Sequence, residues 1–206
     1  MATGIGVIEL TSAQIKAAGE VLARAFYDDP VFLWILPDDA KRAGALSWLM
    51  GTGVRYGHMF GQVHTSSGNV EDGAVWLPPG GTIMSPLRMI RAGMMSAPFK
   101  FGIGAFGRFL SANNHLEHLH KRDAPQQHWY LMILGVDPPR QGQGLGSTVI
   151  QPVLDRADRE NLPCYLETAK ERNLPFYRKH GFEVVVEDDL PRGGPHFWTM
   201  LRQPAR

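Results

Sequence analysis

The chain has 206 residues, of which 44% are hydrophobic and 20% charged, a composition that predicts one globular domain. Its 21 Lys and Arg balance 20 Asp and Glu, and no local run of charge predicts a nucleic-acid-binding face. The one cysteine, Cys164, excludes an intramolecular disulfide and a cysteine cluster for zinc. Without a signal-peptide pattern or an apolar run of roughly 20 residues, we expect a soluble, cytoplasmic protein with no membrane partner.

The N-terminal part of the chain predicts a short strand and two helices. Residues 5–10 alternate weakly, and Thr11-Ser12 is an N-cap pair before a helical pattern that reaches Phe26. Asp28-Asp29-Pro30 is expected to stop that helix, because the residue before proline is pushed out of the α region. A second helix is predicted over residues 39–56.

Two strand-like segments follow, over residues 59–66 and 71–77, joined by Ser67-Gly68-Asn69 as in a hairpin. Residues 84–120 are predicted to be mostly helical and are rich in Met, Phe and Gly. Such a composition suits either an adaptable apolar surface that lines a pocket or the core, and we favour the core.

The C-terminal part has the clearest pattern. Strands are predicted over residues 129–135, 163–167, 182–187 and 196–201, and helices over residues 144–161 and 173–180. Pro152 is expected to break or kink the first of these helices, and Gly181 to stop the second. This order predicts an α/β arrangement in which the final pair of strands makes the sheet mixed.

A glycine-rich segment, residues 140–147, lies between a predicted strand and a predicted helix. Glycine lets a ligand approach the backbone closely, and the N–H groups and dipole at a helix N-terminus favour phosphate. A Walker A loop is excluded because no Gly-Lys-Ser/Thr follows, and a G-x-G-x-x-G fingerprint would require glycine at Ser147. The segment does fit Q/R-x-x-G-x-G/A, through Gln141, Gly144 and Gly146.

With its surroundings, this segment resembles the pyrophosphate loop of the GNAT superfamily of acyl-CoA N-acyltransferases. The strand that enters it ends in Val136-Asp137-Pro138, and Asn173, Tyr177 and Gly181-Phe182 follow downstream, as in that family. Leu166-Glu167-Thr168 and the run from Arg172 to Tyr177 are similar to the puromycin N-acetyltransferase branch. This likeness covers residues 129–201, and the antibiotic substrate is not carried over to this chain.

The resemblance implies a single-domain GNAT-like fold over residues 5–203: a mixed central β-sheet flanked by helices, with a helical insertion around residues 84–120. It also implies acetyl-CoA as co-substrate, with no metal. Backbone groups of Leu134 and Val136 would flank the thioester and pantetheine. The residues implied in cofactor binding are Leu134, Val136, Gln141, Gly142, Gln143, Gly144, Leu145, Gly146, Ser147, Asn173, Phe176 and Tyr177. Asn173 is also expected to cap its helix.

Tyr177 and Glu167 are the candidate catalytic residues. The resemblance gives Tyr177 the role of general acid for the departing thiolate, since tyrosine keeps its proton at neutral pH. Glu167, at a strand end, would accept the amine proton directly or through water, although a solvated strand end is an equally good interpretation. Asp28, Asp29 and His128 are weaker candidates for the base.

The preferred function is therefore direct transfer of acetyl from acetyl-CoA to a primary amine of a small molecule, by a monomer or homodimer. A non-catalytic GNAT-fold sensor of acyl-CoA and a protein N-acetyltransferase remain alternatives. His115, His118 and His120 form H-x-x-H-x-H, but only the first two share a helix face, which argues against a zinc site.

Overall fold

The computed structural model describes residues 6–205. Within that range seven strands form one mixed sheet, in the order β1-β2-β3-β4-β5-β7-β6. The strands are β1 (Val7–Glu9), β2 (Gln62–Ser66), β3 (Asp72–Leu77), β4 (Trp129–Val136), β5 (Cys164–Thr168), β6 (Phe182–Asp189) and β7 (His196–Arg202). The β4–β5 pair is parallel and the other pairs are antiparallel. The predicted mixed α/β sheet is thereby confirmed; residue 5, the expected start of the domain, lies outside the described residues.

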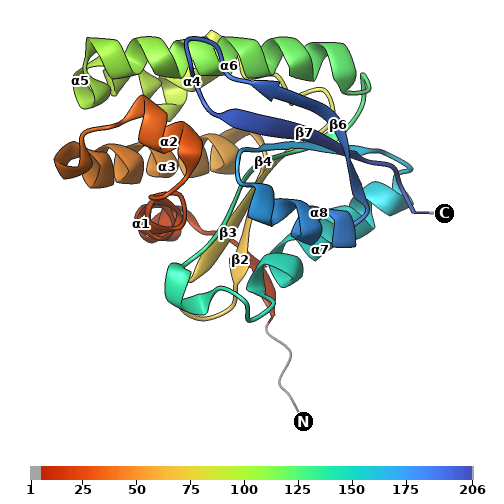
Figure 1. The fold of residues 1–206 in the computed structure, drawn as a ribbon. Coiled ribbons are helices and arrows are strands. Elements are labelled where there is room, and N and C mark those ends of the chain that lie inside the picture. The colour runs from red at the N-terminus through yellow and green to blue at the C-terminus, as the bar shows by residue number, and fades with distance from the viewer. Residues whose placement is uncertain (1–5, 206) are drawn as a thin grey trace.

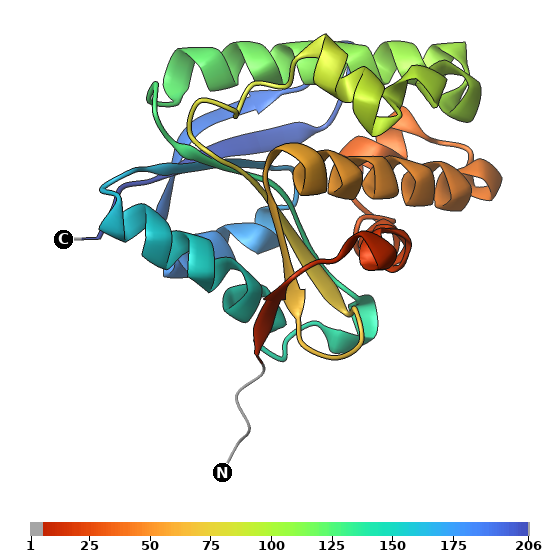
Figure 2. The ribbon, with the colours of Figure 1, turned by 180° about the vertical axis from the view of Figure 1, so that it is seen from behind.

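Helices cover both faces of the sheet (Figures 1 and 2). They are α1 (Ile15–Ala25), α2 (Pro30–Ile35), α3 (Asp39–Phe60), α4 (Pro86–Ala92), α5 (Ala97–Phe101), α6 (Ile103–Asp123), α7 (Leu145–Arg159) and α8 (Leu174–Lys179). Helices α1 and α3 pack against each other and against β3, whereas α7 packs against β2, β3 and β4 in a separate core cluster. None of the helices in residues 6–205 is both long and apolar enough to cross a bilayer.

The first helices depart from the sequence prediction at their ends. Helix α1 ends at Ala25, but Pro30 begins a new helix, α2, instead of only ending the previous one. Proline suits the first helical position, and the Asp29 carboxylate caps this helix by accepting from the Val31 N–H at 3.0 Å. Helix α3 continues to Phe60, so the predicted strand start at residue 59 is wrong. Phe60 packs on Tyr56 one turn earlier, which holds the last turn helical.

The segment between β3 and β4 is mostly helical, as predicted, in the form of α4, α5 and α6. Helix α6 runs along the top of the molecule in Figure 1, above the sheet. It packs against β7 through Ala112, Leu119 and Phe197. Pro152 lies inside α7 without breaking it, because the helix is continuous from Leu145 to Arg159.

Strands β4 and β5 pair only through the first two residues of each, Trp129 with Cys164 and Tyr130 with Tyr165. Beyond them β5 continues along β7, while β4 continues along β3. Strand β4 also has a bulge, because Ile133 pairs with Val75 and Leu131 with Trp76, which leaves Met132 as the extra residue. The two strands that pair at their starts therefore separate into an open wedge.

Candidate active site

A cavity of about 630 Å³ occupies this wedge. Its walls include every residue of β4 from Tyr130 to Val136, the end of β5, and the loop and first turn of α7. The remaining wall comes from the end of α1, from α2, α3, α6 and α8, from the segment around α4, and from β7 with the loop before it. The cavity thus joins the glycine-rich loop to the helical insertion, two regions of the chain that share no sequence motif.

The glycine cradle, which we define as residues 141–147, forms one end of the cavity. Gly142 and Gly144 adopt left-handed φ angles of +77° and +85°, which glycine adopts without strain. A Cβ at either position would meet no atom within 4 Å, so both face open space. Helix α7 begins after Gly144 with no side-chain cap, which leaves its first N–H groups available to an anion. This geometry fits a pyrophosphate.

Not every residue of the cradle faces the cavity. Gln143 does not line it and donates instead to the Pro139 carbonyl at 3.3 Å. The Gln141 amide donates to the Val136 carbonyl at 3.1 Å, so that carbonyl already has a partner. A Cβ on Gly146 would lie 3.4 Å from the Phe176 ring, so this glycine allows α7 and α8 to pack closely. The other cofactor candidates, from Leu134 to Tyr177, all line the cavity.

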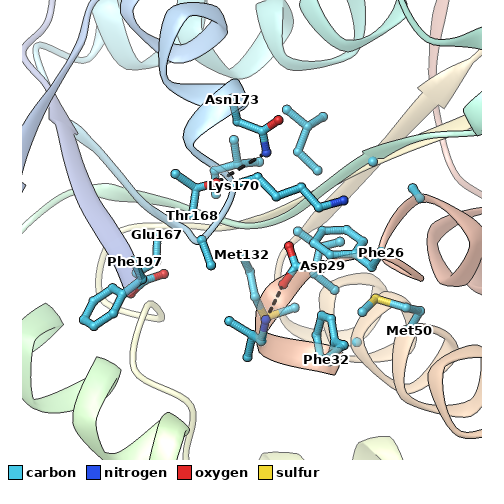
Figure 3. A pocket seen from close by; sticks show the side chains of 18 of the residues that line it. Phe26, Asp29, Phe32, Met50, Met132, Glu167, Thr168, Lys170, Asn173 and Phe197 are labelled. Carbon is cyan, nitrogen blue, oxygen red and sulfur yellow. Dashed lines mark hydrogen bonds between the residues drawn. The ribbon is translucent and has the colours of Figure 1, made fainter. Parts of the chain in front are cut away.

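Glu167 lies at the end of β5 with its carboxylate in the cavity, beside Phe197 (Figure 3). Burial raises its pKa to about 7, and the hydrogen bond that the Tyr130 hydroxyl donates at 2.8 Å lowers it in part. A general base works best when its pKa lies near the working pH. The carboxylate is therefore not a solvated strand end, and its environment suits proton transfer at neutral pH.

Tyr177 and Asp29 also line the cavity. Burial raises the pKa of the Tyr177 phenol, and the charge of Asp29 raises it further, so the hydroxyl keeps its proton at neutral pH. Burial likewise raises the pKa of the Asp29 carboxyl. Figure 3 shows Asp29 with Phe26 and Phe32 on the side of Met132 away from Glu167. The cavity thus contains two carboxylates and a protonated Tyr177 phenol.

The other candidates for the base are less suitable. Lys170 and Arg172 hold the Asp28 carboxylate by ion pairs and lower its pKa, although burial opposes them. His128 lies outside the cavity lining, and its Nδ1 donates to the Pro125 carbonyl at 2.5 Å. Its Nε2 must then accept from His120 at 2.7 Å. Burial lowers the pKa of both imidazoles, that of His120 to about 3, so this pair is neutral.

One further expectation is corrected. The Asn173 side chain does not cap α8; its amide donates to the Thr168 hydroxyl at 3.3 Å, across the turn between β5 and α8. The histidines of H-x-x-H-x-H diverge, since His115 pairs with Asp188 while His120 points inward to His128. Among the described residues, no three His, Cys, Asp or Glu side chains converge as a metal site would require.

The apolar chamber is the other end of the cavity, and no sequence motif predicts it. We define it by Val31, Phe32, Ile35, Leu49, Met50, Met84, Met89, Met94, Phe109, Leu116, Leu190 and Phe197. Met84, Met89 and Met94 come from the Met-rich segment that was expected to favour the core; they do pack against core clusters, but they line the cavity as well. The chamber draws on five regions of the chain, and only the unusual methionine content pointed to it.

Comparison with known proteins agrees with this geometry. The model of the acetyltransferase (GNAT) family matches residues 105–182, which include β4, the cradle and α8. An uncharacterized N-acetyltransferase of Schizosaccharomyces pombe is 28% identical over 196 residues, 92% of this chain and 79% of that protein.

Solved structures share the fold. A structure described as histone acetyltransferase HPA2 and related acetyltransferase from Corynebacterium glutamicum has a TM-score of 0.71 and 22% identity, covering 98% of this chain and 97% of that one. A mosquito arylalkylamine N-acetyltransferase-like protein has a TM-score of 0.60 and 14% identity, covering 97% and 100%. The family model thus matches the segment that holds the cradle, and the solved structures share the fold over nearly the whole chain.

Proposed function

We propose that the chain is an N-acetyltransferase that moves acetyl from acetyl-CoA to a primary amine of a small molecule by direct transfer. The observation that carries the proposal is Glu167, whose pKa of about 7 suits a base, in one cavity with Tyr177 and the glycine cradle. The similarity of residues 129–201 to the puromycin N-acetyltransferase branch is part of this proposal, without its antibiotic.

The cofactor end fits coenzyme A. The N–H groups at the start of α7 and the open faces of Gly142 and Gly144 would hold the pyrophosphate. The edge of β4 that β5 leaves free offers backbone groups to an extended pantetheine chain. When bound, acetyl-CoA supplies the acetyl group in activated thioester form.

Three proton transfers are needed in the proposed reaction. Glu167 accepts the first from the protonated amine, directly or through water, and passes it to solvent, so that nitrogen has a free electron pair for attack on the thioester carbon. After the attack the nitrogen loses its second proton by the same route. Tyr177 donates a proton to the sulfur as the carbon–sulfur bond breaks, and the phenolate then regains one from solvent. Both groups lie in a partly desolvated cavity, where such hydrogen bonds are stronger than in water.

Two alternatives predict different behaviour. A sensor of acyl-CoA would bind the cofactor but needs neither a base with a pKa near 7 nor a buried phenol in its pocket. A protein N-acetyltransferase would need a groove with polar partners for a peptide backbone, whereas the apolar chamber presents mostly hydrocarbon and thioether groups. The described residues favour the small-molecule enzyme.

The test is thermal unfolding with CoA and with pantetheine, which lacks the pyrophosphate and nucleotide. A ligand at a hundred times its Kd stabilises the native state by about 2.7 kcal/mol. For a chain of this size, that raises the Tm by roughly 5–10 °C. We expect this shift with CoA and a much smaller one with pantetheine at equal concentration. No shift with CoA would exclude the proposed cofactor, and thiol release with acetyl-CoA and an amine separates the enzyme from the sensor.

A further inference from the structure

The side chains of the apolar chamber limit the chemical class of the acceptor amine, whereas the cradle concerns only the cofactor. Its walls are Val, Ile, Leu, Phe and Met side chains, beside which Asn113 of α6 also lines the cavity with its amide bonded to the Phe109 carbonyl. The Met-rich segment contributes three thioethers that adapt to irregular shapes. The cations that line the cavity, Arg140, Lys170 and Arg172, come from the cradle loop and the turn after β5. The chamber itself is built from apolar side chains on α2, α3, α6 and their neighbours.

The carboxylates of the cavity lie where the chamber meets the wedge. Among the described lining residues they are Asp29 and Glu167, on opposite sides of Met132 (Figure 3). One oxygen of Asp29 already accepts from the Val31 N–H. The charge of Lys170 also acts on Asp29 and lowers its pKa against the effect of burial, so the negative charge of Asp29 is already partly compensated. If an amine at Glu167 extends the rest of its molecule into the chamber, a second positive charge would lie among apolar walls.

We propose, on the basis of the function proposed above, that the acceptor is a primary amine with one bulky apolar substituent, aryl or alkyl. Its apolar part occupies the chamber and its nitrogen lies at Glu167. The chamber is one end of the cavity, and apolar walls of this kind gain affinity from the apolar area of the ligand that they bury. A polyamine or guanidinoamine of similar length would have to leave its second charge in the chamber, which disfavours it.

Adjacent methionines offer a matched pair of variants. Met94 lines the chamber, whereas Met95, the next residue, is 65% exposed. Met94→Gln and Met95→Gln make the same chemical change, from thioether to amide on an unbranched chain, inside and outside the cavity. Neither residue belongs to the catalytic or cofactor-binding groups, so both variants keep that machinery.

The experiment measures kcat/KM for 2-phenylethylamine, octylamine, agmatine and spermidine with saturating acetyl-CoA, by thiol release. We expect at least a 10-fold preference for the two apolar amines. Met94→Gln should raise the KM for 2-phenylethylamine about 5-fold or more, while the KM for acetyl-CoA stays unchanged and Met95→Gln behaves as wild type.

The outcomes separate the two proposals. Faster acetylation of agmatine or spermidine would overturn the apolar acceptor and leave the N-acetyltransferase in place. Equal effects of the two glutamine variants would also overturn the role of the chamber. Absence of thiol release with every amine, in a protein that binds CoA, would overturn the proposed function and the acceptor class together.

Discussion

The glycine cradle and the apolar chamber are the two ends of one cavity, but the chain builds them differently. The cradle is one continuous segment whose function depends on backbone N–H groups and left-handed glycines. The chamber gathers side chains from five separate regions. A backbone site restricts its own residues tightly, while an apolar wall accepts many combinations of side chains of similar volume. The two ends should consequently respond to mutation independently, with the catalytic groups between them.

The largest effect is expected from Glu167→Gln, at the junction of the two ends. Loss of a general base lowers the rate by about 10²- to 10⁴-fold. The amide keeps the shape of the side chain, so the Kd for CoA should stay within about two-fold of wild type. Single-turnover acetyl transfer measures the rate and calorimetry measures the Kd. If Glu167→Gln keeps the wild-type rate, Glu167 is not the base, and Asp29 or water takes that role.

Tyr177→Phe should lower the single-turnover rate by about 10²-fold, near the low end for a lost general acid, because water can partly replace the hydroxyl. The ring and its packing against Phe182 remain, so the melting temperature should change little. The defect should shrink with an acyl donor whose thiol is more acidic and leaves without a proton. A rate equal to wild type would make Tyr177 a packing residue.

Gly144→Val should act on the cradle alone, and we expect the Kd for CoA to rise about 10-fold or more. The new side chain would enter the open space above the start of α7, and its left-handed φ costs about 1–2 kcal/mol of stability. Gly68→Val is the matched control, since Gly68 also has a positive φ and open space, but lies in the β2–β3 turn. If both variants bind CoA as tightly as wild type, Gly144 is needed only for the backbone conformation of the turn and not for CoA binding.

The smallest effect concerns pH. Below its pKa of about 7 Glu167 is protonated and cannot accept a proton, so kcat/KM should rise with pH through that value. The Tyr130 hydrogen bond stabilises the carboxylate, and its loss in Tyr130→Phe should move the midpoint upward by up to about one pH unit. An unchanged midpoint in that variant would show that another group controls the pH profile.

The C-terminal half was predictable because its structure depends on local patterns. Gly144 and Gly181 both have the left-handed conformation at a helix end that glycine favours, and the alternation of strands and helices follows the sequence closely. The packing role of Gly146 between α7 and α8 was not predictable, because the Phe176 ring beside it belongs to a different helix. Likewise Glu167 could be proposed from its motif, but its raised pKa depends on burial in the folded cavity, opposed by a hydrogen bond from Tyr130, a neighbour that only the sheet register brings close.

The chamber was hidden for the same reason. A methionine at position 94 looks like a core residue in the sequence, and only the folded arrangement of α3, α6 and the segment around α4 leaves space beside it. Helix α2 was missed because Pro30 was interpreted as the end of one helix and not as the start of the next. Local signals thus predict where the backbone turns, but not which distant side chains leave a cavity.

The methionines of the chamber also connect its chemistry to the redox state of its surroundings. Met84, Met89 and Met94 are partly exposed, so an oxidant such as hydrogen peroxide can reach their sulfur atoms. Oxidation to the sulfoxide turns an apolar thioether into a polar group, and methionine sulfoxide reductases reverse it. Methionine oxidation would therefore weaken binding of the acceptor amine. Binding of CoA would be unaffected, because the cradle binds through backbone groups.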